Sequence, residues 1–127
     1  MRQPVPTSLA VLVAVAGTSG VIFGAFGAHA LRGVVDDHAL DIWRTGVDYH
    51  LWHALALGVA VAGGEGRWRA AAAWLFLAGV VLFSGSLYAL ALGAPRLVGV
   101  ITPFGGLAFI AGWIALAGSL KARVSHA

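Results

Sequence analysis

The chain has 127 residues, of which 60% are hydrophobic and only 10% are charged, whereas a soluble domain carries about 25% charged residues. This composition excludes an ordinary soluble globule and predicts a single all-α membrane domain, residues 1–127, with four transmembrane helices in a compact bundle. The net charge of +3 does not indicate nucleic-acid binding, because the basic residues stand at the ends of apolar segments rather than in a patch. The lack of cysteine excludes disulfides, thiol catalysis and thiolate metal sites.

The first predicted span covers residues 8–31. The run from Thr7 to Ala30 contains no Asp, Glu, Lys or Arg, and as a helix it is long enough to cross the roughly 30 Å hydrocarbon core. Arg2 and the tripeptide Ala28-His29-Ala30 also fit a cleaved signal peptide. We expect a retained helix instead, because the apolar region is much longer than the about 7–15 residues of a signal peptide.

The sequence changes in character between residues 36 and 48. Acidic residues recur there every three or four positions, while Leu40, Trp43 and Val47 recur on another face. The pattern predicts an amphipathic helix lying at the membrane interface, capped at its start by an aspartate. We expect this interfacial helix to precede the second span, residues 44–62, and to run into it without a break.

Arg44 is the centre of a predicted group of interfacial ion pairs. It follows Asp41 by three residues and precedes Asp48 by four, so both carboxylates are within reach on a helix. The competing interpretation is a solvated, salt-bridged helix face without further function.

The third and fourth spans are predicted at residues 70–92 and 97–120. Pro103 stands early in the fourth span, where proline is tolerated, so we expect a bent start to that helix. Stripes of small residues on the first and fourth spans predict close helix packing. Both termini are predicted on the cytoplasmic side, because this topology places five basic residues inside and three outside.

This topology brings the polar residues of the spans to one depth, in the outer half of the bundle. They are His29, Tyr49, His50, His53, Ser84, Ser86, Tyr88 and Thr102. A polar layer in a membrane is a functional-site hypothesis, because unpartnered polar groups are costly there. The alternative is that these side chains only tie the helices together, each hydrogen bond contributing about 1 kcal/mol or less.

This layer presents three further chemical alternatives. The histidines present an alternative site for haem iron, Cu or Zn, but no carboxylate or Cys-x-x-Cys-His motif completes such a site, so we predict no metal and no cofactor. Ser84 or Ser86 beside a histidine is the one candidate for nucleophilic catalysis, and we favour a protein that is not an enzyme. Transport ranks third, because no Asp, Glu, Lys or Arg lies deep in a span.

Several motifs together resemble a known family. They are Gly24-Ala25-Phe26-Gly27-Ala28-His29-Ala30-Leu31, Trp43-x-Thr45-Gly46 with Tyr49 and His53-Ala54-Leu55-Ala56, Leu82-Phe83-Ser84-Gly85-Ser86-Leu87-Tyr88, and Thr102-Pro103-x-Gly105-Gly106 with Gly112-Trp113. In order and spacing they are similar to the domain of unknown function 423 family. The resemblance implies a small four-helix protein of the bacterial inner membrane and supplies no activity. His50 lies outside the motif, and we leave it out of the predicted site.

The predicted function is a small, non-enzymatic structural or partner-binding membrane component, assembled as a homo-oligomer or in a larger complex. Its polar layer, formed by His29, Tyr49, His53, Ser84, Ser86, Tyr88 and Thr102, holds the helices together or binds a lipid-like or quinone-like molecule. The alternative is an electron- or proton-handling protein that uses its histidines with haem or a metal. A small transporter is the third interpretation.

Overall fold

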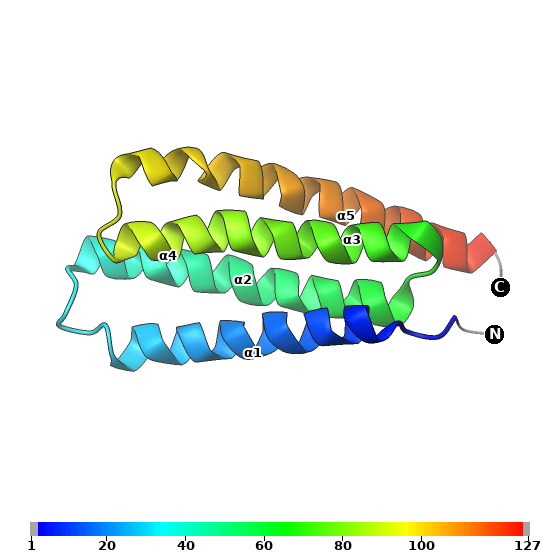
Figure 1. The fold of residues 1–127 in the computed structure, drawn as a ribbon, viewed down its shortest axis with the longest axis horizontal. Helices are drawn as coiled ribbons and strands as arrows, with labels where there is room; N and C mark the ends of the chain where they lie inside the picture. Colours follow the sequence, from blue (N-terminus) through cyan, green and yellow to red (C-terminus); the bar gives the residue numbers. More distant parts are fainter. Residues whose placement is uncertain (1–2, 126–127) are drawn as a thin grey trace.

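A computed structural model describes residues 3–125, and helices form the regular structure of this part of the chain. They are α1 (Thr7–His29), α2 (Asp37–Gly63), α3 (Gly66–Gly79), a π-helical segment η1 (Val80–Ser84), α4 (Gly85–Ala91), a 3₁₀-helix η2 (Arg96–Val100) and α5 (Thr102–Ser125). Because α3, η1 and α4 follow one another without a break, the chain makes an up-and-down bundle of long helical rods (Figure 1).

Three of these rods are long and apolar enough to cross a membrane: Thr7–His29, Gly66–Ala91 and Arg96–Val124. They coincide closely with the first, third and fourth predicted spans. The predicted second span lies in α2, which does not reach the same apolarity. The physical reason is that Asp48, His50 and His53 interrupt its apolar sequence.

The predicted interfacial helix does not exist as a separate element. Asp36 caps α2, its carboxylate accepting a hydrogen bond from the Ala39 N–H at 2.7 Å, and the helix continues unbroken to Gly63. The predicted cap and the predicted continuity are therefore confirmed. The amphipathic segment forms the first turns of a rod that runs along the bundle (Figure 1), because no helix breaker separates it from the apolar part.

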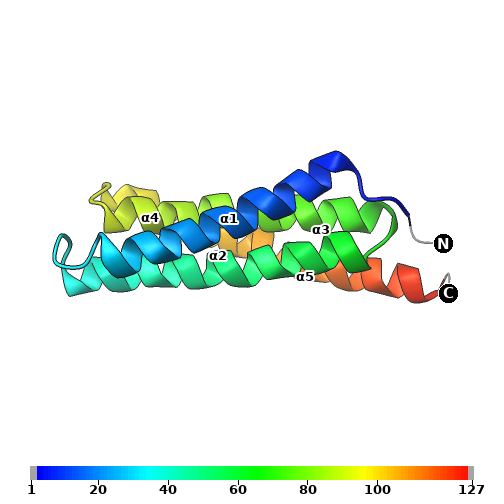
Figure 2. The same cartoon turned by 90° about the horizontal axis from the view of Figure 1, so that it is seen from below.

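Glycines set the spacing between α1 and α2, which lie side by side in both views (Figures 1 and 2). A Cβ at Gly20 would be only 2.6 Å from the Leu51 side chain, and one at Gly24 would be 3.3 Å from Val47. A Cβ at Gly27 would overlap the Trp43 ring. The small-residue stripe thus packs against the same chain, through close backbone approach.

Glycines also set the spacing between helix α5 and its neighbours α3 and η1. Gly105 has no room for a Cβ, because the Phe83 backbone lies against it, and a Cβ at Gly112 would be 2.7 Å from the Phe76 ring. Pro103 lies in the first turn of α5, after the 3₁₀-helix η2, a position in which proline is tolerated. Phe76 itself is fully buried in the core.

The outer surface of the bundle is apolar. Large side chains such as Val21, Leu55 and Ile114 are 64%, 71% and 67% exposed. Soluble proteins rarely expose wide contiguous apolar surfaces. A surface of this kind is suited to contact with lipid, which agrees with the apolarity of three of the helices.

Candidate functional site

The polar residues of the bundle centre on two histidines of α2. His50 and His53 are three positions apart, so their side chains leave the helix about 60° apart around its axis. Because α2 contacts α1, α3, α4 and α5, this small angle directs them to different neighbours. His50 faces α1 and α4, and His53 faces α5.

His50 is almost completely buried, with 2% of its surface exposed. Its Nε2 lies 3.0 Å from the Ala16 carbonyl oxygen and 3.0 Å from Ser19 Oγ, and its Nδ1 lies 2.8 Å from Tyr88 Oη. A carbonyl oxygen only accepts hydrogen bonds, so Nε2 carries the proton and Nδ1 accepts from the Tyr88 hydroxyl. The neutral imidazole therefore satisfies both of its nitrogens and connects three helices.

Aromatic rings enclose this contact. The Tyr88 ring lies 4.5 Å from the Trp43 ring and 5.0 Å from the Phe23 ring, between ring centroids. Trp43 Nε1 donates to the Phe23 carbonyl at 2.9 Å, and Ser84 Oγ donates to the Gly46 carbonyl at 2.7 Å. We call His50, Tyr88, Ser19 and the Ala16 carbonyl the His50 knot, in which the His50 and Tyr88 side chains are buried.

His53 has a different environment. Its Nδ1 donates to the Tyr49 carbonyl one turn earlier, at 2.7 Å, and its Nε2 accepts from Trp113 Nε1 of α5 at 3.1 Å. The imidazole stacks on the Phe109 ring, with centroids 3.6 Å apart and planes 12° from parallel. Both nitrogens are again occupied, so the ring is fixed as a flat, neutral wall.

Next to that wall is an apolar cavity of about 590 Å³. It opens on the side of the bundle between α2 and α5, where Trp52 and Ile110 are 55% and 59% exposed. We call it the His53 pocket, and its lining residues are Tyr49, Trp52, His53, Phe83, Gly106, Phe109, Ile110 and Trp113. Its volume is in the range of about 300–1,000 Å³ that small-molecule sites occupy.

The other predicted polar residues include Ser86, Thr102 and His29. Ser86 Oγ and Thr102 Oγ1 bond each other at 2.6 Å, and Ser86 also donates to the Phe83 carbonyl. His29 is exposed at the end of α1. It lies ten residues beyond Ser19, or about 15 Å along the helix, at the rim of the bundle. Its place in the polar layer stays a prediction.

The predicted ion pairs are reduced to one. Arg44 NH1 lies 3.7 Å from Asp41 Oδ1, with both side chains more than half exposed. Asp48 is also exposed, and within residues 3–125 no ion pair joins it to Arg44. Exposed ion pairs of this kind contribute about 0–1 kcal/mol, so the missing second pair costs little stability.

The contacts also bear on the metal and catalytic alternatives. In the described part of the chain, no group of three or more His, Asp and Glu side chains is placed to hold a metal ion. The ring nitrogens of His50 and His53 are engaged with protein groups. Ser84 and Ser86 bond carbonyl or hydroxyl oxygens rather than a histidine.

Three residues that take part in these hydrogen bonds were not among the predicted site residues: His50, Ser19 and Trp113. A signal for His50 was present, because it continues the buried face of Trp43 and Val47 at the next helical position. The partnership of Trp113 with His53 joins residues 60 positions apart, and no local pattern indicates such a contact.

A family model described as "Protein of unknown function (DUF423)" matches residues 23–106. The chain belongs to this family. The UPF0382 membrane protein YwdK of Bacillus subtilis (strain 168) is 47% identical over 109 residues, covering 82% of this chain and 88% of that protein. The UPF0382 inner membrane protein YgdD of Escherichia coli (strain K12) is 42% identical, covering 91% of this chain and 94% of that protein. No solved structure matches the chain.

These comparisons confirm the family resemblance seen in the sequence motifs. The segment matched by the DUF423 model includes both histidines of α2 and Tyr88. It ends before Trp113 and begins after Ser19, so the two clusters reach beyond it at both ends. The chain is a membrane protein of an uncharacterised family, with helical spans.

Proposed function

We propose that the protein is a non-enzymatic, multi-pass component of the bacterial inner membrane that holds the ring of a quinone-like, lipid-soluble molecule in the His53 pocket. The observation that carries this proposal is the pocket itself, a cavity of about 590 Å³ walled by aromatic rings and open on the side of the bundle. A ligand that enters from the side of a membrane bundle arrives from lipid and is therefore apolar.

The proposal includes four spans, with α2 crossing alongside the other rods. Helix α2 has 27 residues, or about 40 Å of length, and it contacts the other long helices. Its two histidines are turned inward and hydrogen bonded, so mean hydropathy understates how well α2 tolerates lipid. In this cysteine-free chain, Asp37→Cys and Arg67→Cys should react with a membrane-impermeant thiol reagent from opposite faces; reaction from one face would contradict the crossing.

The chemistry of the pocket favours a flat ring with a polar edge. The stacked His53 and Phe109 rings provide parallel planar surfaces, and aromatic groups prefer offset-stacked or edge-on contacts. The Tyr49 carbonyl accepts from His53. The Tyr49 hydroxyl belongs to a half-buried side chain that lines the cavity and has no hydrogen-bond partner within residues 3–125, so we expect it to donate to a quinone carbonyl. His53 acts as a positioning residue, since its own nitrogens are occupied.

The His50 knot supports this pocket from a neighbouring face of α2. It fixes α2 against α1 and α4, so that the rotation of α2, and with it the direction of His53, is set. The proposal includes both termini on the cytoplasmic side, which the distribution of basic residues favours.

A short-chain ubiquinone tests the proposal in the detergent-purified protein. Quinones quench indole fluorescence, and Trp52 and Trp113 line the pocket, so binding should appear as saturable quenching. Gly106→Leu is the blocking variant: a Cβ at Gly106 has its nearest neighbour at 4.0 Å, so the larger side chain fills the pocket without a clash. We expect at least a tenfold weaker affinity in this variant.

Gly58→Leu is the matched control, because Gly58 lies in a different groove and a Cβ there meets nothing within 4 Å. Its affinity should equal that of the unmodified chain. Quenching that never saturates, or that is the same in Gly106→Leu, would contradict the proposed pocket.

A further inference from the structure

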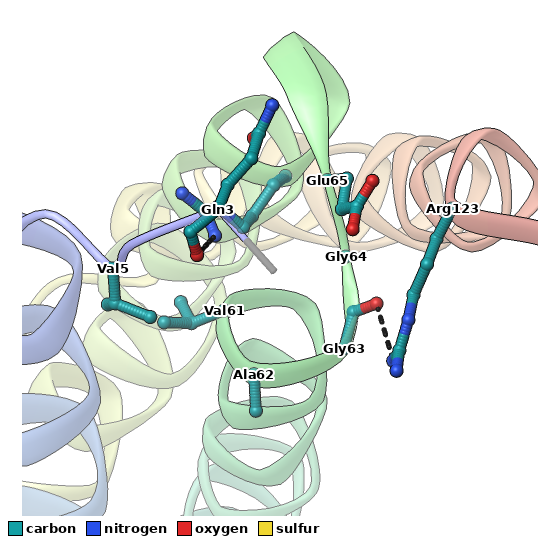
Figure 3. A pocket seen from close by; sticks show the side chains of 9 residues that line it. Gln3, Val5, Val61, Ala62, Gly63, Gly64, Glu65 and Arg123 are labelled. Atoms are coloured by element: carbon teal, nitrogen blue, oxygen red, sulfur yellow. Dashed lines mark hydrogen bonds between the residues drawn. The ribbon is translucent and has the colours of Figure 1, made fainter. Parts of the chain in front are cut away.

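A second pocket lies at the end of the bundle where the chain enters α1 and where α5 ends (Figure 1). It has a volume of about 250 Å³ and is formed by the segment before α1, the turn between α2 and α3, and the last turns of α5. Figure 3 shows Gln3 and Val5 on one flank and Glu65 and Arg123 on the other. We call it the Arg69 pocket.

Arg69 lines this pocket and is only 6% exposed. Its NH2 donates to the Pro4 carbonyl at 2.9 Å and its NH1 to the Gln3 carbonyl at 3.5 Å. Both acceptors are neutral, and within residues 3–125 no ion pair to Arg69 is present. A buried charge without an opposite charge is costly, and a guanidinium has five N–H donors, so Arg69 retains the capacity to bind an anion.

A second guanidinium reaches the same pocket. Arg123 NH1 donates to the Gly63 carbonyl at 3.2 Å (Figure 3), which holds the C-terminal part of α5 at the α2–α3 turn. Glu65 also lines the pocket, so two guanidiniums stand against one carboxylate. Arginine pairs bind phosphate oxygens through charge-assisted hydrogen bonds, often two in parallel.

An apolar groove adjoins this charged pocket. It runs between α1 and α2, has a volume of about 610 Å³ and shares Ala62 with the Arg69 pocket. From Ala62 to Leu51, the two ends of its lining on α2, the helix extends about 16 Å. A Cβ at Gly17 or Gly58 would meet nothing within 4 Å, so the groove is open along its length.

We propose that the Arg69 pocket binds the phosphate group of an anionic phospholipid, with an acyl chain lying in the α1–α2 groove. A charged pocket that shares Ala62 with an adjoining apolar groove matches a molecule with a phosphate head and a hydrocarbon tail. Basic pockets between membrane helices, close to the bilayer surface, are known to suit such head groups. This site is separate from the His53 pocket and does not depend on the function proposed for it.

The test uses the full chain in a neutral detergent, with the midpoint of thermal unfolding, Tm, as the measurement. Phosphatidylglycerol, phosphatidylcholine and inorganic phosphate are the three probes. We expect phosphatidylglycerol to raise Tm by about 4 °C or more, phosphatidylcholine to have a much smaller effect, and phosphate alone to have little. Arg123→Gln and Arg69→Gln should lose most of the phosphatidylglycerol shift.

Matched controls separate the head-group site from the groove. Arg67→Gln removes an exposed arginine two positions from Arg69 and outside the pocket, and it should keep the full shift. Gly58→Leu fills the groove and should reduce the shift, whereas Gly106→Leu should not.

The remaining outcomes overturn the proposal. If inorganic phosphate raises Tm as much as phosphatidylglycerol, and Gly58→Leu changes nothing, the pocket takes free phosphate rather than a lipid. If the two lipids act equally, or Arg123→Gln keeps the full shift, the pocket has no anionic specificity. Should Arg69→Gln fail to fold, Arg123→Gln decides alone, because Arg123 is less buried than Arg69.

Discussion

His50 and His53 are the same residue type, one helical turn apart on the same helix, and the fold uses them differently. His50 makes hydrogen bonds to α1 and α4 and is 2% exposed, and His53 bonds its own helix and α5 and is 6% exposed. The difference lies in what adjoins them. Close-packed rings surround the His50 knot, whereas His53 borders a cavity of about 590 Å³.

This comparison shows that burial and hydrogen bonding alone do not identify a site in a membrane bundle. Both imidazoles have their nitrogens occupied, so neither is free to bind a ligand directly. What separates them is the space beside the ring and its access to the lipid side. We expect His50, which connects three helices, to contribute to the stability of the bundle. We expect His53, which forms the wall of a pocket, to set the shape of that pocket.

The largest expected difference between the two histidines is in the stability that is lost when each imidazole is removed in turn. His50→Ala deletes the contacts to Ala16, Ser19 and Tyr88 and leaves a buried hydroxyl without its partner. We expect a loss of about 2–4 kcal/mol in the free energy of unfolding. His53→Ala should cost less, about 1–2 kcal/mol, because one of its bonds lies within α2 and the Trp113 side chain is half exposed.

Unfolding in mixed detergent micelles with increasing denaturing detergent measures both values. Conservative replacement by Gln or Asn provides a control for the change in volume. Equal losses for the two variants, or a larger loss for His53→Ala, would show that the distinction between knot and pocket wall is incorrect.

The sequence was sufficient for the long helices but not for their contacts. The helices over the runs without charged residues and the cap at Asp36 have local causes, and these features were predicted correctly. The distance of His29 from the histidines of α2 could not be predicted, because reach along a helix depends on where the neighbouring helix begins. His50 was discounted on a motif argument, although its ring packs on the face that Trp43 and Val47 already define.

The His53 pocket was also beyond sequence reasoning. Tyr49 and His53 belong to the predicted site, but the cavity beside them exists because Phe83 and Phe109 pack from two other helices. The close approach of Gly105 to the Phe83 backbone places those helices. Such a contact joins distant parts of the chain, and its geometry follows from the packing of whole helices.

The finest test removes single hydrogen-bond donors. Tyr88→Phe removes only the hydroxyl that His50 Nδ1 accepts from, and we expect a loss of about 1 kcal/mol, in line with interhelical hydrogen bonds in membranes. Trp113→Phe removes the donor to His53 Nε2. Its cost should be about 0.5 kcal/mol or less, because the site is open on the lipid side.

Double-mutant cycles turn these values into a direct comparison of the two histidines. The coupling between His50→Ala and Tyr88→Phe should approach the full cost of Tyr88→Phe, because the hydroxyl bonds that buried imidazole. The coupling between His53→Ala and Trp113→Phe should be smaller, because their hydrogen bond is longer, 3.1 Å against 2.8 Å, and the Trp113 side chain is half exposed. Similar couplings in the two cycles would mean that the two imidazoles support the bundle equally, and the cavity beside His53 would then be a by-product of packing.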